Sequence, residues 1–329
     1  AFSESTELTA RLTQASILGH QGPTGNTGVM ATAKHFIGDG ATDFGVEGGN
    51  TTLSQEEIIT RLLPPYKAAV ESGVASVMAS FNTMHGIPMH AHKVMITDLL
   101  KGRLQFDGIV VSDWKAYSRF GQNEIINAGI DMVMAVDGDL DGFQEGVKAG
   151  VLNGSISVER INDAVRRILR QKFRFGLFEN PFPNKSLINK IGIPEHRAVA
   201  RQAVRESLVL LKNENQALPI KRTSKIVVVG PFADNSGLQS GGWTVNWQGM
   251  TENYSGAKTI LEGLKKFAIH EIKYDREGTG EITDVDLAVI VVGENPYSEF
   301  FGDIGGEMDL FQLTLTEEHQ QYIKTYADK

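Results

Sequence analysis

The sequence predicts an α/β fold built around a parallel sheet. From residue 29 to about residue 175, short β-rich runs alternate with helical patterns, which indicates consecutive βα units. The β-rich runs are apolar nearly throughout, as strands covered on both faces require. A second, smaller set of the same pattern follows a stretch rich in Pro and Asn. A barrel and a doubly wound sheet both satisfy these observations.

The first set of units contains strands and helices in alternation. The expected strands cover residues 29–36, 75–81, 108–114 and 132–136. The expected helices cover residues 54–63, 92–104, 123–129, 142–152 and 158–173. Ser54 followed by Glu57 predicts a capping box at the start of one helix, and Gly73 and Gly150 stand where helices are expected to stop.

Residues 176 to about 190 concentrate Pro, Asn and Gly and predict a linker. We therefore place a first domain at 1–178, the linker at 179–190 and a second domain at 191–329. In the second domain a helix is expected over 194–213. The further elements expected there are strands at 225–232, 270–276 and 287–294 and helices at 257–267 and 316–327.

Composition narrows the classes of function. The 329 residues are 41% hydrophobic, enough for sizeable cores, and carry a net charge of -8. No block of Lys or Arg is present, which argues against a nucleic acid or an anionic membrane as partner. The chain has no Cys, so disulfides, thiolate nucleophiles and Cys-based metal sites are excluded. The first residues, AFSESTELTARL, lack the pattern of a signal peptide, and no apolar window is long enough to span a bilayer.

Polar or aromatic side chains stand at the carboxyl ends of three consecutive predicted strands. They are Lys34 and His35, Phe81 and Asn82, and Asp113 and Trp114. In parallel α/β folds the ligand site gathers at this end of the strands. A carboxylate, hydrogen-bond donors and an aromatic face together suit a sugar or an acyl group. The alternative is structural, since residues at strand ends often cap helices.

Seven motifs, in this order and at these separations, resemble glycoside hydrolase family 3, in its branch of exo-acting β-glucosidases and β-glucan exohydrolases. They are KHFIGDG, GIVVSDW, GIDMVM, INDAVRRILRQKFRFGLFE, RESLVLLKN, GGWTVNWQG and VGENPYSE. The resemblance covers essentially the whole chain. It implies that residues 1–178 are the C-terminal portion of a (β/α)8 TIM-like barrel and that residues 191–329 are the N-terminal portion of an α/β sandwich domain.

The resemblance also implies a function and assigns the main roles. It points to a retaining β-glycosidase that removes non-reducing-end β-D-glucosyl residues, with Asp113 as the nucleophile and Glu299 as the acid/base. Lys34 and His35 would hold hydroxyls of the terminal glucose. Retaining hydrolysis requires the two carboxyl groups to stand about 5–5.5 Å apart, one ionised and the other protonated.

Aromatic side chains complete the implied sugar site. Trp114 and Trp247 would clamp the next sugar from opposite sides. Trp243 is included with the substrate-binding residues, although packing in a core or an interface is the reading that the motif favours. Phe81, also included, stands where many relatives carry a tyrosine, so a hydroxyl that could orient the nucleophile is missing.

Several acidic residues have competing interpretations. Glu294 lies in the same loop as Glu299 and is a rival acid/base. Asp39 and Asp43, in the loop after KHF, either bind sugar or cap turns, and Asp39 is kept among the substrate-binding candidates.

A calcium site is not expected. The segment with Asp137, Asp139, Asp141 and Gly142 imitates the start of a calcium loop, but Lys148 stands where the bidentate Glu is needed. We expect no metal and no cofactor, and the expected partner is a small carbohydrate, a β-glucan oligosaccharide or a β-glucoside.

The chain also departs from the family pattern. AFSESTE resembles the tail of an RWGRxxExxSED segment, and four barrel units are present where eight are expected, so a partial chain is expected. The resemblance implies export to the periplasm or to the outside of the cell. Oligomeric state and linkage preference are left open.

Four functions other than a β-glucosidase are alternatives, and the sequence disfavours some of them. The loop GDGATDFGVEGGN has no histidine, which disfavours the β-N-acetylhexosaminidase branch. A β-xylosidase differs at the sugar's C6 and stays open. KIVVVGPF and VIVVGE suggest a nucleotide-binding module, but neither continues as GxGxxG or a P-loop. A catalytically silent sugar-binding fragment, with binding unchanged by Asp113→Asn, is the remaining alternative.

Overall fold

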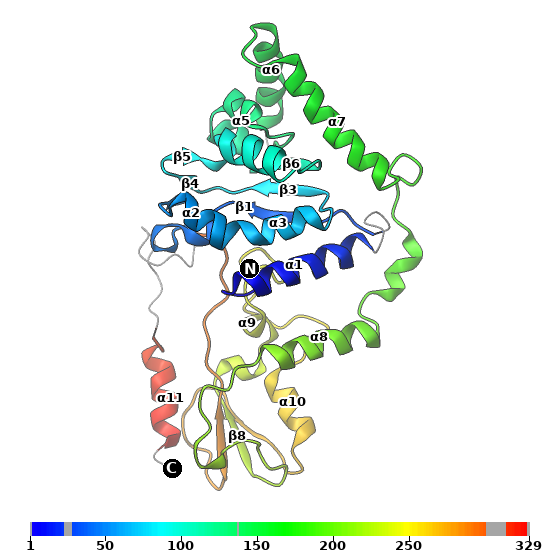
Figure 1. The fold of residues 1–329 in the computed structure, drawn as a ribbon. Helices are drawn as coiled ribbons and strands as arrows, with labels where there is room; N and C mark the ends of the chain where they lie inside the picture. Colours follow the sequence, from blue (N-terminus) through cyan, green and yellow to red (C-terminus); the bar gives the residue numbers. More distant parts are fainter. Residues whose placement is uncertain (1, 23–27, 137, 301–313, 328–329) are drawn as a thin grey trace. The chain divides into compact units, whose positions relative to one another are not determined.

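The computed structural model describes residues 2–22, 28–136, 138–300 and 314–327. The chain forms two compact units, residues 1–184 and 185–329 (Figure 1). The division falls inside the stretch 179–190. Among the described residues, no helix is long and apolar enough to cross a membrane.

The first unit is built from alternating strands and helices, as expected. In chain order the elements are α1 (Thr6–Gln21), β1 (Thr32–Phe36), η1 (Asp39–Ala41), η2 (Asp43–Gly45), β2 (Asn50–Thr51), α2 (Gln55–Glu57), η3 (Ile58–Leu62), α3 (Leu63–Glu71), β3 (Ser76–Ala79), β4 (Thr83–Met84), β5 (Ile87–Pro88), η4 (Met89–Ala91), η5 (Val94–Arg103), β6 (Ile109–Trp114), α4 (Ala116–Arg119), α5 (Gln122–Ala128), β7 (Met132–Met134), α6 (Asp139–Leu152) and α7 (Val158–Arg174).

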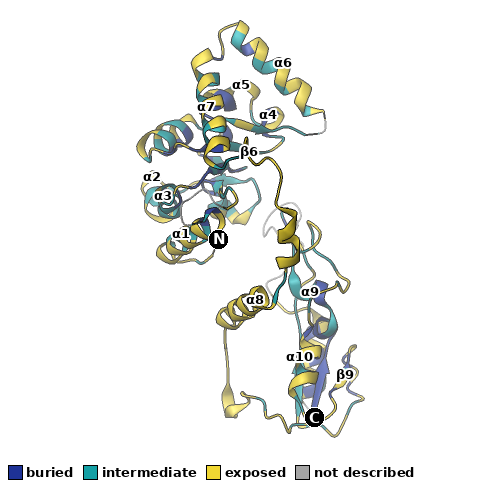
Figure 2. Ribbon diagram, turned by 90° about the vertical axis from the view of Figure 1, so that its right-hand side faces the viewer, coloured by how far each residue is buried: buried dark blue, intermediate teal, exposed yellow. Residues whose placement is uncertain are grey.

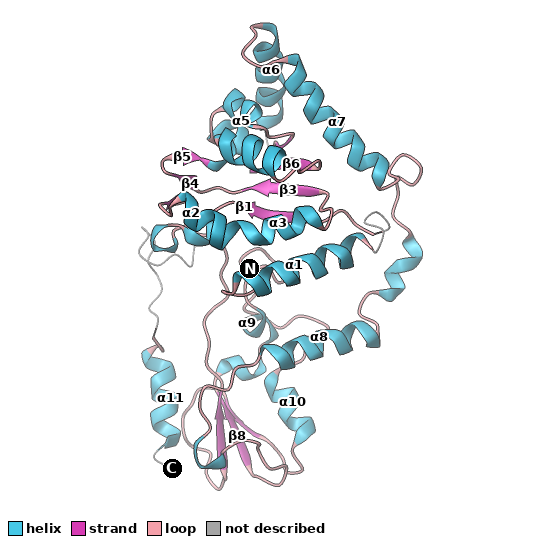
Figure 3. Cartoon of the chain, viewed as in Figure 1, coloured by secondary structure: helices cyan, strands magenta, loops and turns pink. Residues whose placement is uncertain are grey.

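The main sheet of the first unit has the order β1-β3-β6-β7, and all neighbouring strands are parallel (Figure 3). Its register pairs Ser76 with Ile109 and Val111 with Met132. Strand order follows chain order, as consecutive βα units of a barrel require. The prediction of a parallel α/β sheet is therefore confirmed.

Apolar side chains from the sheet and its helices make one core. Phe36, Val77 and Val110 on the strands are almost fully buried in the same cluster as Ile96 of η5 and Ile125 of α5. Both faces are buried only at the start of β6, at Ile109 and Val110, whereas β1 and β3 alternate between buried and more exposed residues. The apolar run without alternation is therefore explained by burial on both faces in β6.

Local capping signals decide where some helices begin and end. The Ser54 side chain accepts the Glu57 N–H, and the Glu57 carboxylate accepts the Ser54 N–H, which confirms the predicted capping box. Gly73 follows α3 with a φ of +74°, the left-handed conformation that favours glycine.

The expectation that Gly150 ends a helix is wrong. Helix α6 continues to Leu152, and Gly154 takes the positive φ, at 79°. Gly150 is instead buried where elements approach closely, because a Cβ there would lie 2.8 Å from both Asn123 Nδ2 and Ile156 Cδ1. The glycine marks tight packing, not a helix end.

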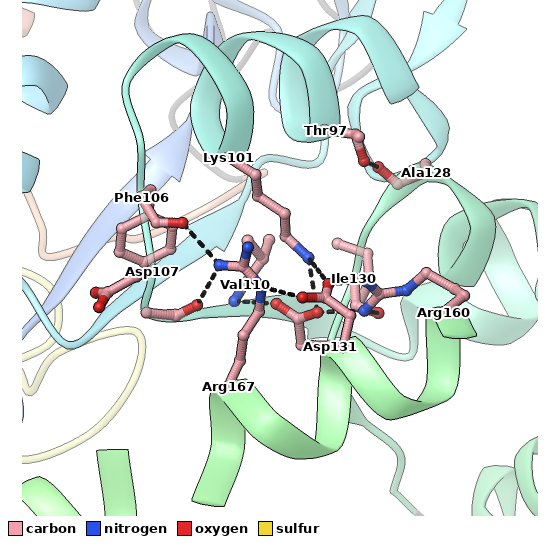
Figure 4. Close-up of polar contacts among 12 residues, drawn as sticks. Thr97, Lys101, Phe106, Asp107, Val110, Ala128, Ile130, Asp131, Arg160 and Arg167 are labelled. Carbon is pink, nitrogen blue, oxygen red and sulfur yellow. Dashed lines mark hydrogen bonds and ion pairs between the residues drawn. The ribbon is translucent and has the colours of Figure 1, made fainter. Parts of the chain in front are cut away.

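A group of charged residues, which we call the Asp131 cluster, lies where β6 and β7 begin (Figure 4). Its members are Lys101 of η5, Asp131, and Arg160, Asp163 and Arg167 of α7. The Asp131 side chain is fully buried, and Lys101 Nζ lies 2.7 Å from Asp131 Oδ1. Burial lowers the pKa of Lys101 to about 8, opposed by the attraction of Asp131. The cluster fastens α7 and η5 to the sheet at the end opposite Asp113.

The second unit is a smaller α/β unit. In chain order its described elements are η6 (Lys185–Lys190), α8 (Pro194–Ser207), η7 (Glu214–Gln216), β8 (Ile226–Val229), η8 (Pro231–Asp234), α9 (Ser236–Ser240), α10 (Ile260–Phe267), β9 (Lys273–Asp275), β10 (Leu287–Ile290) and α11 (Glu317–Ala327). The parallel sheet has the order β10-β8-β9, and all four residues of the central strand β8 are buried. Leu261 of α10 and Tyr322 of α11 belong to two separate clusters around β8.

The helix expected over 194–213 is shorter than predicted. Helix α8 ends at Ser207, and Leu208 is already extended. Among the described residues α8 buries no side chain, and it is exposed along its length in Figure 2. Tertiary packing supplies most of the stability of a helix. Because α8 does not pack on other elements, no such stabilisation extends it through the apolar residues that follow.

Candidate active site

Asp113 lies at the carboxyl edge of the main sheet, near the end of β6. Its side chain is 14% exposed, and its Oδ2 lies 3.5 Å from His35 Nε2 on β1. The N–H of Trp114 donates to Asp113 Oδ1 at 2.7 Å. The carboxylate is therefore oriented by two neighbours and is still accessible, an arrangement that lets a carboxylate react with a ligand at this edge.

His35 stands between two carboxylates. Its Nδ1 lies 3.5 Å from Asp39 Oδ2, while its Nε2 faces Asp113. The Tyr66 hydroxyl donates to the His35 carbonyl at 2.6 Å and fixes the backbone there. The structure thus brings Asp39, His35 and Asp113 together, and a protonated His35 would attract both carboxylates.

Lys34 and Asp43 do not belong to the group formed by Asp39, His35 and Asp113. Lys34 is exposed on β1, and its side chain forms no hydrogen bond or ion pair with another described residue. The Asp43 carboxylate accepts the Thr52 hydroxyl at 2.8 Å. This bond joins the loop after β1 to Thr52 and is not the turn cap that was one of the two expected roles of Asp43.

Asn82, at the end of the β3 strand region, is fully buried and ties two loops together. Its Nδ2 donates to Thr51 Oγ1 at 2.9 Å, and the Thr51 hydroxyl donates to the Gly38 carbonyl at 2.9 Å. A Cβ on Gly38 would lie 2.9 Å from Asn82 Nδ2, so glycine is required for this approach. Asn82 therefore positions the loop that carries Asp39.

His90 was not selected from the sequence. It is fully buried in η4, and its Nε2 accepts the Asp113 N–H at 2.9 Å. The reasoning from strand ends could not find it, because η4 follows the short hairpin of β4 and β5 and no strand of the main sheet ends there. A histidine between Met89 and Ala91 does not belong to any sequence motif that would indicate a functional role.

Aromatic rings surround His90 and reach the surface. Phe81 lies 5.9 Å from His90, and Phe120 stacks on it at 5.0 Å and 10°. The Arg119 guanidinium lies 4.8 Å from the Phe81 ring centre, within the range of a cation–π contact. Trp114 is 51% exposed at the same edge and can offer its face to a ligand. The Phe81 ring thus packs against His90, the residue that accepts the Asp113 N–H.

In the second unit, Trp247 and Glu299 are joined directly. The Trp247 indole N–H donates to Glu299 Oε2 at 3.0 Å. The Ser298 hydroxyl donates to the Trp247 carbonyl at 2.7 Å, and the Ser298 N–H donates to Gln248 Oε1 at 2.8 Å. These contacts fix the residues before Glu299 against the GGWTVNWQG loop.

The remaining candidates of this unit lie in the same two segments. The backbone N–H of Trp243 donates to the Trp247 carbonyl at 3.0 Å. The residue is 67% exposed, so it is not a core residue. Glu294 is exposed and accepts the Tyr297 hydroxyl at 3.2 Å. Glu294 and Glu299 therefore have different partners, a phenol and an indole.

The acidic residues of the calcium-like segment lie at the start of α6. Asp139 and Asp141 lie in the first turn of α6, where acidic side chains favour a helix. Asp137 lies outside the described residues. In the part of the chain that the structure describes, no group of three metal-ligating side chains comes together.

Comparisons with known proteins agree with one another. Residues 1–171 match the Glycosyl hydrolase family 3 N terminal domain, and residues 208–329 match the Glycosyl hydrolase family 3 C-terminal domain. The chain is 30% identical to the lysosomal beta glucosidase of Dictyostelium discoideum, over 92% of this chain and 42% of that protein. It is 29% identical to a beta-xylosidase of Formosa agariphila, over 94% of this chain and 48% of that protein.

A solved structure shows the same fold. A mutant of the exo-1,3/1,4-beta-glucanase ExoP from a Pseudoalteromonas species superimposes with a TM-score of 0.90 and 36% sequence identity, over 99% of this chain and 55% of that one. The chain thus spans about half the length of the relatives that it matches. On the strength of both domain matches and of this superposition, the chain belongs to glycoside hydrolase family 3.

Proposed function

We propose that this chain carries the reacting groups of a retaining β-glycosidase that removes β-D-glucosyl residues from the non-reducing ends of β-glucans, oligosaccharides or glucosides. The observation that carries the proposal is the setting of Asp113. Its carboxylate is accessible at the carboxyl edge of a parallel sheet and is oriented by the Trp114 N–H and by His35. The beta-glucosidase and exo-1,3/1,4-beta-glucanase among the relatives support a β-glucosyl substrate.

In the first step Asp113 attacks the anomeric carbon, and the bond from that carbon to the leaving oxygen breaks. Oδ1 accepts the Trp114 amide, which leaves Oδ2 the freer oxygen for attack. Glu299 gives its proton to the leaving oxygen. The products of this step are a glucosyl ester on Asp113 and the released alcohol.

In the second step water attacks the anomeric carbon, and Glu299 takes the proton that the water loses. The ester bond to Asp113 breaks, and glucose leaves with the β configuration that it had in the substrate. Two inversions at one carbon give net retention, so the stereochemistry of the product reports the mechanism.

The other candidate residues would bind the sugars. Lys34, His35 and Asp39 would hold hydroxyls of the terminal glucose, since His35 lies at the Asp113 carboxylate and Asp39 lies at His35. Trp114 and Trp247 are both exposed, and their aromatic faces would hold the next sugar. Phe81 and Trp243 would support these faces. The partner is a small carbohydrate, and the name of the Dictyostelium relative supports delivery outside the cytoplasm.

The test follows the anomeric proton by NMR during cleavage of an aryl β-glucoside. The proposal expects β-glucose to appear first and Asp113→Asn to abolish turnover. Asp107→Asn is the matched control, because Asp107 precedes β6 at its other end and pairs with Arg174 on the surface. First formation of α-glucose, or undiminished turnover by Asp113→Asn, would contradict the proposal.

A β-xylosidase is the second candidate, and the relative from Formosa agariphila favours it. Glucose and xylose differ only by the group at C5, so the ratio of kcat/KM for the two aryl glycosides decides between them. A preference for the glucoside by more than about tenfold, roughly 1.4 kcal/mol, supports the first function.

A further inference from the structure

The amide of Asp113 lies beyond the last residue pair between β3 and β6. The register between β3 and β6 ends at the pair Met78 and Val111, and the register between β6 and β7 shifts between Val111 and Trp114. The N–H of Asp113 donates not to a strand carbonyl but to Nε2 of His90, at 2.9 Å. A side chain thus takes the place of a neighbouring strand at this residue.

The His90 ring is held in place from several sides. It is fully buried, stacked on Phe120 at 10° and flanked by Phe81. The element that carries it is also fastened, because the N–H of the fully buried Met89 donates to the Asn82 carbonyl at 3.0 Å. The acceptor for the Asp113 amide therefore has little freedom to move.

The ring is in its neutral form. Burial lowers the pKa of His90 to about 3, assisted by the charges of Arg119 and His35 and opposed by the Ser80 backbone. A ring nitrogen that accepts a hydrogen bond carries no proton, so the proton of the neutral ring is on Nδ1. Nε2 is then an acceptor throughout the pH range in which glycosidases work.

The other side of the Asp113 backbone is fixed as well. The Ser112 hydroxyl donates to the Asp113 carbonyl at 2.9 Å and accepts the Met134 N–H at 2.9 Å. Ser112 is fully buried. The backbone of the residue is therefore held by His90 through its N–H and by Ser112 through its carbonyl, in addition to the contacts of its carboxylate with Trp114 and His35.

We propose that His90 is a positioning residue for the nucleophile, whose Nε2 replaces a strand carbonyl as acceptor for the Asp113 amide and so sets where the carboxylate meets the anomeric carbon. This inference rests on the proposed function of Asp113. A displacement of about 1 Å at a reacting group can cost roughly 100-fold in rate. Loss of the acceptor should therefore slow attack while sugar binding stays nearly unchanged.

The first test needs no turnover. Long-range ¹H–¹⁵N spectra of the histidine rings, assigned with His90→Gln, should show Nε2 without a proton, Nδ1 with one, and no titration between pH 8 and pH 5. Amide exchange of Asp113 should be slow in the wild type. A proton on Nε2, or a titration midpoint near the ordinary value of about 6.5, would overturn the inference.

The second test separates the acceptor from the ring. His90→Gln keeps an acceptor oxygen but loses the ring, whereas His90→Phe keeps the ring shape but loses the acceptor. Both are treated with a 2-deoxy-2-fluoro β-glucoside bearing a good leaving group, and labelling is followed by intact mass. We expect His90→Phe to label about 10 to 100 times more slowly with a binding constant changed less than about threefold, and His90→Gln to recover most of the rate.

Two further measurements distinguish a folding defect of the variants from the loss of the positioning role. Thermal unfolding and Asp113 amide exchange are measured on both variants, and faster exchange is expected only in His90→Phe. Equal labelling rates in the two folded variants would overturn the positioning role. Labelling of the wild type at a residue other than Asp113 would instead refute the proposed function, while the ring spectra and the exchange rate would still report the hydrogen bond itself.

Discussion

The indole N–H of Trp247 donates a 3.0 Å hydrogen bond to the Glu299 carboxylate. The side chain proposed to carry the leaving sugar is thereby joined to the side chain proposed to protonate its oxygen. Ser298 strengthens the link, because its hydroxyl donates to the Trp247 carbonyl at 2.7 Å. Binding of a sugar on Trp247 would therefore change the orientation of the Glu299 carboxylate.

Trp247→Phe should slow the cleavage of substrates with a poor leaving group. Phenylalanine keeps an apolar face but cannot donate, so Glu299 loses its orienting partner. We expect kcat to fall about fivefold, roughly 1 kcal/mol, for a disaccharide and less than about twofold for a dinitrophenyl glucoside. Tyr297→Phe, which removes a donor to Glu294 in the same loop, is the control and should change neither rate. Equal losses on both substrates would argue against the link.

Glu299→Gln should behave as the loss of a general acid/base. Cleavage of the disaccharide should fall by about 100-fold or more, because a general acid contributes roughly that much. The dinitrophenyl glucoside needs no protonation, so its ester on Asp113 should still form. Azide should then restore turnover and give β-glucosyl azide, detected by NMR.

Glu294→Gln distinguishes the rival carboxyl in the same assay. Its side chain is exposed and accepts only the Tyr297 hydroxyl among its hydrogen bonds to described residues. We expect unchanged rates and no product with azide. Azide rescue of this variant, and not of Glu299→Gln, would exchange the roles of the two residues.

The sequence was informative where local patterns determine structure. Apolar strands without alternation predicted the parallel sheet, and the strand ends pointed to His35 and Asp113, which the structure places 3.5 Å apart. His90 could not be found in this way, because its partner is a backbone amide distant in sequence and its own segment has no regular pattern. Gly150 was misjudged for a related reason, since close packing and helix termination both select glycine.

His90 should make the stability of the first unit depend on pH. Its pKa is about 3 in the folded protein and ordinarily about 6.5, so the unfolded chain binds one proton more between these values. The free energy of unfolding should therefore decrease as the pH falls through this window, by up to about 1.4 kcal/mol per pH unit from this residue. Urea unfolding at pH 7 and pH 5 should show a smaller decrease in His90→Gln. An identical decrease would contradict the assignment.

Asp131→Asn should destabilise the first unit. The carboxylate is fully buried and balances Lys101 and Arg160, so its loss leaves these two cations with the partly exposed Asp163 as their remaining partner in the cluster. We expect the free energy of unfolding to fall by about 3–5 kcal/mol in urea titrations followed by circular dichroism. Asp107→Asn, in an exposed pair with Arg174, should cost less than about 1 kcal/mol. Similar values for the two variants would show that the Asp131 cluster does not fasten the sheet.

The role of Asp113 as nucleophile is tested most directly by trapping its ester. The protein is incubated with a 2-deoxy-2-fluoro β-glucoside that has a good leaving group, and the intact mass and the peptide map are then recorded. We predict one fluoroglucosyl group, located on Asp113, and no adduct on Asp113→Asn. An adduct on another residue, or unchanged labelling of the Asp113→Asn variant, would contradict the account.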